Sequence, residues 1–129
     1  MLASILATLT VASCPVCAPL TTAQLEQAAA VDRDAAAAMT AKDYTRALEL
    51  YEEAGRLTCH ADYWLLSGVV LTKLLRPREA ICRLDRALSC TPSSGTRVKA
   101  VRWRSKAHTL LAEVKLDADT PWPDAALRA

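Results

Sequence analysis

The chain has little of the residues from which catalytic and nucleotide-binding sites are usually built. Its 129 residues include only three glycines and two histidines, and phenylalanine and asparagine are absent. Three isolated glycines cannot form a loop that cradles a phosphate, and no pair of carboxylates stands in an apolar setting that would make one a general acid. We therefore expect neither an enzyme nor a bound cofactor.

The sequence also lacks the pattern of a half-buried β-strand. No segment alternates apolar and polar residues, whereas several stretches repeat apolar residues every three or four positions. A chain of this length forms one domain at most. We predict an all-α domain over residues 21–116, between an apolar N-terminal segment over 1–20 and a tail over 117–129 that contains proline and tryptophan.

The clearest helical pattern lies in residues 61–92, where two amphipathic stretches of similar length meet at Arg76 and Pro77. A residue before proline disfavours the α-helical conformation, so the first helix ends near Arg76. Proline is itself well tolerated at the first position of a helix, so Pro77 can begin the second. The pattern predicts two antiparallel helices joined by a short turn.

The order of small and large residues in this pair resembles the tetratricopeptide (TPR) repeat. That repeat of about 34 residues reads Trp-x2-Leu-Gly-x2-Tyr, then Ala-x3-Phe, then Pro. At these positions and at a further small residue of the second helix, the chain has Trp64, Ser67, Gly68, Leu71, Ala80, Leu84, Ala87 and Pro92. Small residues such as Gly68 and Ala80 allow two helices to approach closely, with Trp64 beside them. The alternative is an unrelated antiparallel helix pair built from the same residue types.

A single repeat cannot bury its own apolar face, so neighbours are expected. About 33 residues earlier, Ala47, Tyr51 and Ala54 repeat the spacing of Ala80, Leu84 and Ala87. A helix over 22–41 precedes them, with a capping box at its start, and a helix over 97–116 follows the central pair after a loop. The resemblance implies a right-handed α-solenoid of antiparallel helix hairpins, with two repeats and a C-terminal capping helix.

The TPR resemblance also implies a binding groove lined by the first helix of each repeat. Such grooves hold an extended peptide or a helix of another protein. The alignment places these residues on the groove: Asp32, Ala36 and Met39; Leu65, Val69, Thr72 and Lys73; Val98, Val101, Ser105 and His108. With only two repeats, self-association that completes the stack is a further possibility.

Charge is unevenly distributed along the chain. Residues 21–62 hold eight acidic and four basic residues, whereas residues 73–115 hold eleven basic and three acidic residues. The last helix contributes a basic face made of Arg97, Lys99, Arg102, Arg104 and Lys106. A solvated face is the simplest interpretation. An acidic protein or lipid headgroup is a second, and nucleic acid is the least favoured because Trp103 lies on the apolar stripe of the helix.

The N-terminal segment begins with about twelve apolar or small residues, which is too short to span a bilayer. Its length is typical of the apolar region of a secretion signal. Residues 11–14, Val-Ala-Ser-Cys, resemble a bacterial lipobox, which implies that Cys14 is lipidated and that the protein is tethered in the cell envelope. No basic residue precedes the apolar run, so the alternative is an apolar helix packed on the domain of a cytoplasmic protein.

Five cysteines are a high count for a chain of this length. Cys14 and Cys17 have the C-x-x-C spacing of redox proteins, but such motifs lie at a strand-to-helix junction, and no strand is expected here. Cys59 and Cys90 lie near the ends of equivalent helices, which makes them candidates for a disulfide bond in an oxidising compartment. The alternative is a pair of buried thiols, and Cys82 has no evident partner in the sequence.

These observations favour a non-enzymatic protein-binding adaptor, tethered in the bacterial envelope through Cys14. The first alternative is a soluble cytoplasmic adaptor or assembly subunit whose apolar N-terminus packs in its core or interface. A weaker alternative is a nucleic-acid-binding module that uses the basic face.

Overall fold

The computed structural model describes residues 20–119, with side chains described as far as Lys115. This part of the chain forms five helices and no strand, which confirms the all-α prediction. The helices are α2 (Thr22–Thr40), α3 (Tyr44–Thr58), α4 (Ala61–Lys73), α5 (Pro77–Ser89) and α6 (Ser94–Asp119). Residues 1–19 and 120–129 lie outside the described part.

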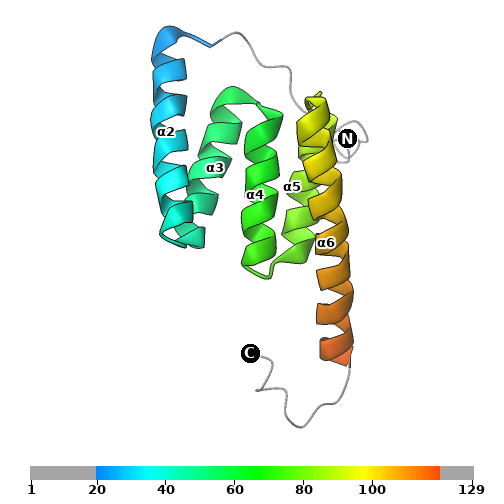
Figure 1. Cartoon of the computed structure of the whole chain (residues 1–129). Helices are drawn as coiled ribbons and strands as arrows, with labels where there is room; N and C mark the ends of the chain where they lie inside the picture. Colours follow the sequence, from blue (N-terminus) through cyan, green and yellow to red (C-terminus); the bar gives the residue numbers. More distant parts are fainter. Residues whose placement is uncertain (1–19, 120–129) are drawn as a thin grey trace, which may run out of the picture.

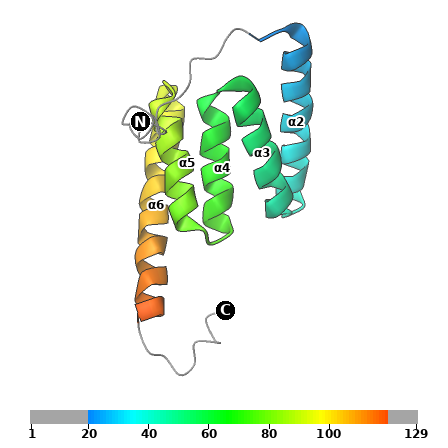
Figure 2. The same ribbon diagram turned by 180° about the vertical axis from the view of Figure 1, so that it is seen from behind.

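The five helices pack mainly against their neighbours in sequence, in antiparallel pairs. In Figure 1, α2, α4 and α6 lie on the near face, and α3 and α5 lie behind them. Contacts between α4 and α6 join two helices of the near face directly. Figure 2 shows from behind that α6 continues well past the end of α5. Alternate helices therefore share a face, and α4 lies at the centre of the domain.

The helix ends follow from local side-chain chemistry. Thr21 and Gln24 form the expected capping box: the Gln24 amide donates to Thr21 Oγ1 at 3.2 Å, and the Thr21 amide donates to Gln24 Oε1 at 2.9 Å. Pro77 occupies the first turn of α5, as predicted. The last helix begins at Ser94, three residues before its predicted start at residue 97. The Ser93 hydroxyl accepts a hydrogen bond from the Thr96 backbone amide at 3.2 Å and so caps the helix at this earlier point.

The core depends on a close approach between α4 and α5. A Cβ atom on Gly68 would lie 2.5 Å from Cγ and Cδ2 of Leu84, and 3.3 Å from the Ala80 carbonyl oxygen. Leu84 and Ala80 are completely buried, so neither can move aside into solvent. The expected role of Gly68 and Ala80 as small contact residues is therefore confirmed. Trp64 also contacts α3, because its ring lies against Gly55, where an added Cβ would come within 2.9 Å.

The one polar residue in the core of α4 is also accommodated. Ser67 is completely buried, and its hydroxyl donates to the Tyr63 carbonyl oxygen at 2.8 Å. A buried hydroxyl costs little free energy when it is hydrogen-bonded in this way. Ser67 can therefore occupy a position where the TPR pattern has leucine.

Substitution of Gly68 tests this close approach. Gly68→Ala places a methyl group in space that Leu84 already fills, so we expect the free energy of unfolding to fall by about 1–3 kcal/mol. For a domain of this size, each kcal/mol lowers the melting temperature by about 4–8 °C. Circular dichroism melting measures the change.

Gly95→Ala is the matched control, because Gly95 is also helical but has no atom within 4 Å of its added Cβ. Its melting temperature should stay the same or rise slightly, since alanine is the better helix former. Equal melting temperatures for wild type and Gly68→Ala would contradict the packing described here.

Candidate protein-binding groove

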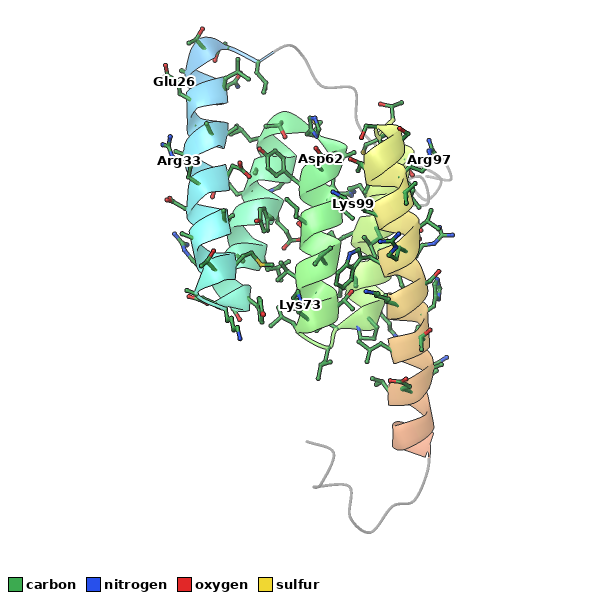
Figure 3. All side chains as sticks on the ribbon, viewed as in Figure 1. Glu26, Arg33, Asp62, Lys73, Arg97 and Lys99 are labelled. Atoms are coloured by element: carbon green, nitrogen blue, oxygen red, sulfur yellow. The ribbon has the colours of Figure 1, made fainter. Side chains whose placement is uncertain are left out.

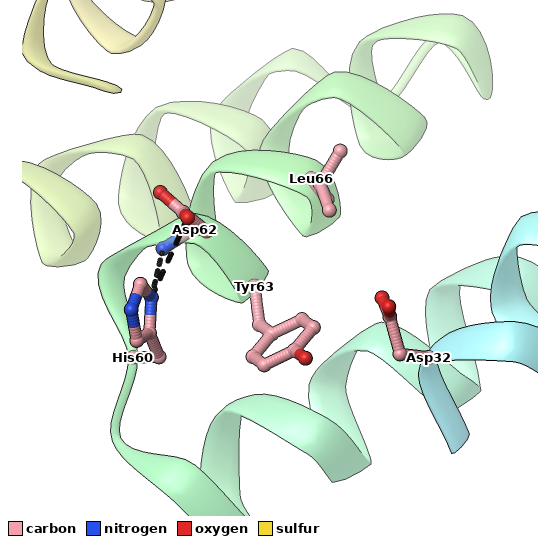
Figure 4. A pocket seen from close by; sticks show the side chains of 5 residues that line it. All are labelled: Asp32, His60, Asp62, Tyr63 and Leu66. Carbon is pink, nitrogen blue, oxygen red and sulfur yellow. Dashed lines mark hydrogen bonds and ion pairs between the residues drawn. The ribbon is translucent and has the colours of Figure 1, made fainter. Parts of the chain in front are cut away.

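A hollow of about 250 Å³ opens between α2 and α4 on the near face of the domain. Asp32 borders it from α2, and α4 and the loop before it supply the other walls. The lining residues are Asp32, His60, Asp62, Tyr63 and Leu66. Figure 4 shows the Tyr63 ring between His60 and Asp32. The hollow therefore combines carboxylates with an aromatic ring and a leucine, a mixture that can bind a polar side chain and an apolar one together.

Asp62 is held in place from two sides. The side chain of His60 caps α4, because its Nδ1 accepts the Asp62 amide at 3.2 Å. The same nitrogen lies 3.6 Å from Asp62 Oδ2. The hydroxyl of Thr96, at the start of α6, donates to Asp62 Oδ1. The carboxylate thus links α4 to α6 while it borders the hollow.

Asp32 acts electrostatically on two tyrosines. Burial raises the pKa of the Tyr63 phenol above its usual value, and the carboxylates of Asp32 and Asp62 raise it further. The pKa of Tyr51 rises in the same way, first through burial and then through Asp32 and Tyr63. Both phenols consequently stay neutral near pH 7. The hollow presents negative charge from its carboxylates beside neutral aromatic rings.

The opposite end of α4 has positive charge beside aromatic rings. The ammonium group of Lys73 lies 5.9 Å from the ring centre of Tyr44 and 5.7 Å from that of Trp103. The ammonium group of Lys106 lies 4.4 Å from the Trp103 ring centre. Cation–π contacts of this kind orient a lysine without neutralising its charge. Figure 3 places Asp62 and Lys73 at opposite ends of α4, with Lys99 directed from α6 toward the same face.

The residues predicted to line the groove differ in how far they are exposed. Asp32 borders the hollow, and Lys73 is exposed at the far end of α4. Leu65 is buried in the core with 6% of its surface exposed, so it does not line an open groove. Val69, Thr72 and Met39 are half-buried. The exposed residues of the predicted set are Ala36, Val98, Val101, Ser105 and His108.

Four residues of the hollow and both aromatic rings beside Lys73 were not predicted from the sequence. The missed residues are His60, Asp62, Tyr63 and Leu66 at the hollow, and Tyr44 and Trp103 at the lysine end. One signal was available: Asp62, Leu66, Val69 and Lys73 recur at the spacing of one helix face. The alignment placed Leu65 on the groove instead of Leu66, which lies about 100° further around the helix.

Most of the predicted basic face is exposed on α6, as expected from its sequence. Arg97, Lys99, Arg102 and Lys106 are exposed. Arg104 is half-buried, and its guanidinium group donates to Asp85 Oδ1 of α5 at 2.9 Å. Part of this charge therefore joins α6 to α5, and the remainder faces solvent.

The cysteines of the described part are in two different states. Cys59 and Cys90 are both disulfide-bonded, whereas Cys82 is exposed and free. The pairing of Cys59 with Cys90 stays a prediction. The lipidation candidate Cys14 lies outside the described residues. Across residues 20–119, no cluster of histidine, cysteine or acidic side chains could hold a metal ion.

No protein-family model matches this chain. The TPR resemblance therefore carries no family assignment, and the candidate site is supported by its own geometry. In the part of the chain that the structure describes, no helix is long and apolar enough to cross a membrane.

The electrostatic effect of Asp32 is measurable by titration of the tyrosines. Asp32→Asn removes one cause of the raised phenol pKa values but leaves the larger cause, burial, in place. We expect Tyr51 and Tyr63 to ionise at lower pH than in wild type, but still above the usual value of about 10. The ultraviolet absorbance of phenolate, recorded in a Tyr44→Phe background, reports these two residues alone.

Asp34→Asn is the matched control, because Asp34 also lies on α2 but is exposed and affects neither phenol. It should leave the titration curve where it is. Identical curves for Asp32→Asn and Asp34→Asn would show that Asp32 does not act on the hollow.

Proposed function

We propose that this domain is a non-enzymatic protein-binding adaptor that holds a segment of another protein against the near face of α4. The single observation that carries the proposal is the row formed by Asp62, Leu66, Val69 and Lys73. These residues recur along one helix face and stay exposed or half-buried between α2 and α6. Such a mixed row can contact charged and apolar groups of a partner together.

The row defines the chemistry of the segment it would bind. Asp62 and Lys73 are eleven residues apart in one helix, which corresponds to about 16 Å. About five residues of an extended peptide span that distance. A fitting peptide carries a hydrogen-bond donor or cation near Asp32 and Asp62, an apolar side chain over Leu66 and Val69, and a carboxylate near Lys73. A helix with the same charge order is the alternative form of the ligand.

We further propose that the five helices are two TPR-like hairpins and a capping helix, arranged as a right-handed α-solenoid. The two turns that would be equivalent, α2–α3 and α4–α5, support this. Lys42 and Leu75, 33 residues apart, both have φ 60°, an uncommon value for residues other than glycine. Their turns repeat the same backbone hydrogen bonds: Asp43 to Ala38 corresponds to Arg76 to Leu71, and Lys42 to Met39 corresponds to Leu75 to Thr72.

The disulfide bonds of Cys59 and Cys90 support a place for this adaptor in the cell envelope. Disulfides persist in oxidising compartments and are rare in the bacterial cytosol. The cytoplasmic alternative predicts that both residues are thiols in the native host. Nucleic-acid binding is not favoured, because two lysines already lie over the half-buried ring of Trp103, the residue that would stack on bases.

Site-specific photocrosslinking in the native host tests the adaptor function. A photoreactive amino acid at Leu66 should give a covalent adduct with one partner protein. The same amino acid at Arg78, an exposed residue of α5, should not. Adding Lys73→Glu to the Leu66 variant should reduce the adduct several-fold, because the reversed charge repels the partner's carboxylate.

Arg78→Glu is the matched control for charge, since Arg78 is exposed on α5, which lies behind the face that carries the row. It should leave the adduct unchanged. Absence of an adduct at Leu66, or equal adducts at Leu66 and Arg78, would overturn the proposed binding face.

A further inference from the structure

Cys59 and Cys90 occupy equivalent places at one end of the domain. Cys59 ends α3 in a left-handed conformation with φ 54°, and Cys90 ends α5. Both line one hollow of about 490 Å³, whose walls are Thr58 to Asp62 from the α3–α4 loop and Cys90 to Ser93 from the α5–α6 loop. Both are disulfide-bonded. Two oxidised cysteines therefore border one space at the end of the helices.

The sequence limits the residues that can bond to them within the chain. Its five cysteines are Cys14, Cys17, Cys59, Cys82 and Cys90, and Cys82 is free. Cys59 and Cys90 therefore bond either to each other or to Cys14 and Cys17. If Cys59 bonds to Cys90, the states of Cys14 and Cys17 are left unassigned. If Cys59 and Cys90 bond instead to Cys14 and Cys17, four of the five cysteines are paired and Cys82 is the one left over.

Distance favours the second pairing. Cys59 and Cys90 end α3 and α5, which are not consecutive: α4 packs against both of them. Axes of packed helices lie about 8–10 Å apart, while the Cα atoms of a disulfide usually lie within about 7 Å. Cys14 and Cys17 are three residues apart, and an extended chain of that length spans up to about 10 Å. A C-x-x-C segment can therefore bridge two helix ends at the usual axis spacing, which is wider than a direct disulfide bond usually spans.

The direction of the chain also favours it. Because consecutive helices are antiparallel, α2 begins at the end of the domain where α3 and α5 finish (Figures 1 and 2). Thr21, the cap residue, is four positions after Cys17, a reach of up to about 14 Å, and seven positions after Cys14, a reach of up to about 25 Å. Chain length therefore limits how far either cysteine can be from the start of α2, at the end of the domain that holds Cys59 and Cys90.

We propose that Cys14 and Cys17 form two disulfide bonds with Cys59 and Cys90, and so attach the N-terminal segment covalently to the α3–α4 and α5–α6 loops. Each bond joins two thiols, which lose two protons and two electrons. The oxidant is the disulfide of a thiol–disulfide oxidoreductase, which is reduced to a dithiol once for each bond formed. The proposal is independent of the ligand of the α4 face.

The proposal conflicts with two sequence-based predictions, the Cys59–Cys90 disulfide bond and the lipidation of Cys14. The sulfur of Cys14 cannot be both a disulfide sulfur and the thioether of a lipid. In a molecule with both bonds, the resemblance of residues 11–14 to a lipobox has no functional consequence. The N-terminal segment is then a covalent part of the domain.

Peptide mapping of protein isolated from the native host tests the pairing directly. Free thiols are first alkylated without reduction, and trypsin then cuts after lysine and arginine. Cys14 and Cys17 fall in the peptide that ends at Arg33, Cys59 in peptide 57–73, and Cys90 in peptide 87–97. The proposal predicts one species of three linked peptides that separates on reduction, with Cys82 as the alkylated cysteine.

Each other result overturns the proposal. A species that contains only peptides 57–73 and 87–97 would show that Cys59 bonds to Cys90. A diacylglyceryl mass on Cys14 would show lipidation instead. Alkylated Cys59 and Cys90 would show that neither is oxidised in the host, and a reductant-sensitive dimer would show bonds between chains. Cys82→Ser is the control, because it should leave the three-peptide species unchanged.

Discussion

The absence of a side chain at Gly68 is the constraint on which the rest of the domain depends. Leu84 fills the space where a Cβ would be, and this allows α4 and α5 to pack closely enough to bury Ala80 completely. On another face of α4, Trp64 lies against Gly55 and fixes the distance to α3 in the same way. Two glycine contacts thus position α4 between the helices behind it, and α4 carries the candidate binding face.

The position of α4 explains how an accessible row of mixed polarity can coexist with a stable core. On the buried side of α4, Leu65, Val70 and Leu71 are nearly or completely inaccessible, whereas Leu66 and Val69 of the row pack against the core only in part. The helix α2 is rich in alanine, and short side chains leave space beside α4 where the hollow opens. Polar residues at the two ends of the row are held by neighbouring helices: Asp62 by Thr96 of α6, and Lys73 by the rings of Tyr44 and Trp103.

The sequence predicts the helices well because their signals are local. Capping by Thr21, the proline at the start of α5 and the spacing of small residues each act within a few positions. The start of α6 was predicted three residues late, because serine and glycine are typical of loops and the cap by Ser93 depends on its rotamer. Along α6, Ala100 and Ala107 are buried but Val114 is 43% exposed, because α6 runs past the end of α5.

The candidate site was less predictable, because it depends on how α4 is rotated and on contacts between helices. Leu65 and Leu66 are both apolar, and they differ by about 100° around the helix axis. The pattern alone therefore could not decide which one faces the core. Residues distant in sequence, such as Asp32 and Tyr63, meet only after α2 and α4 are placed. The same applies to Lys73 and Trp103, whose contact needs α6 to pack on α4.

The N-terminal cysteines link the fold to the compartment in which it forms. Lipidation of Cys14 would require export, and disulfides at Cys59 and Cys90 persist in oxidising compartments, so both are consistent with the proposed envelope location. They differ in what holds the protein there. A lipid anchors the domain at a membrane and leaves residues 15–20 as a tether. Two disulfides would instead close the end of the domain at the hollow between the α3–α4 and α5–α6 loops. That hollow shares His60 and Asp62 with the acidic hollow between α2 and α4. In that case the oxidation state of the cysteines would also affect the Asp62 end of the proposed binding face.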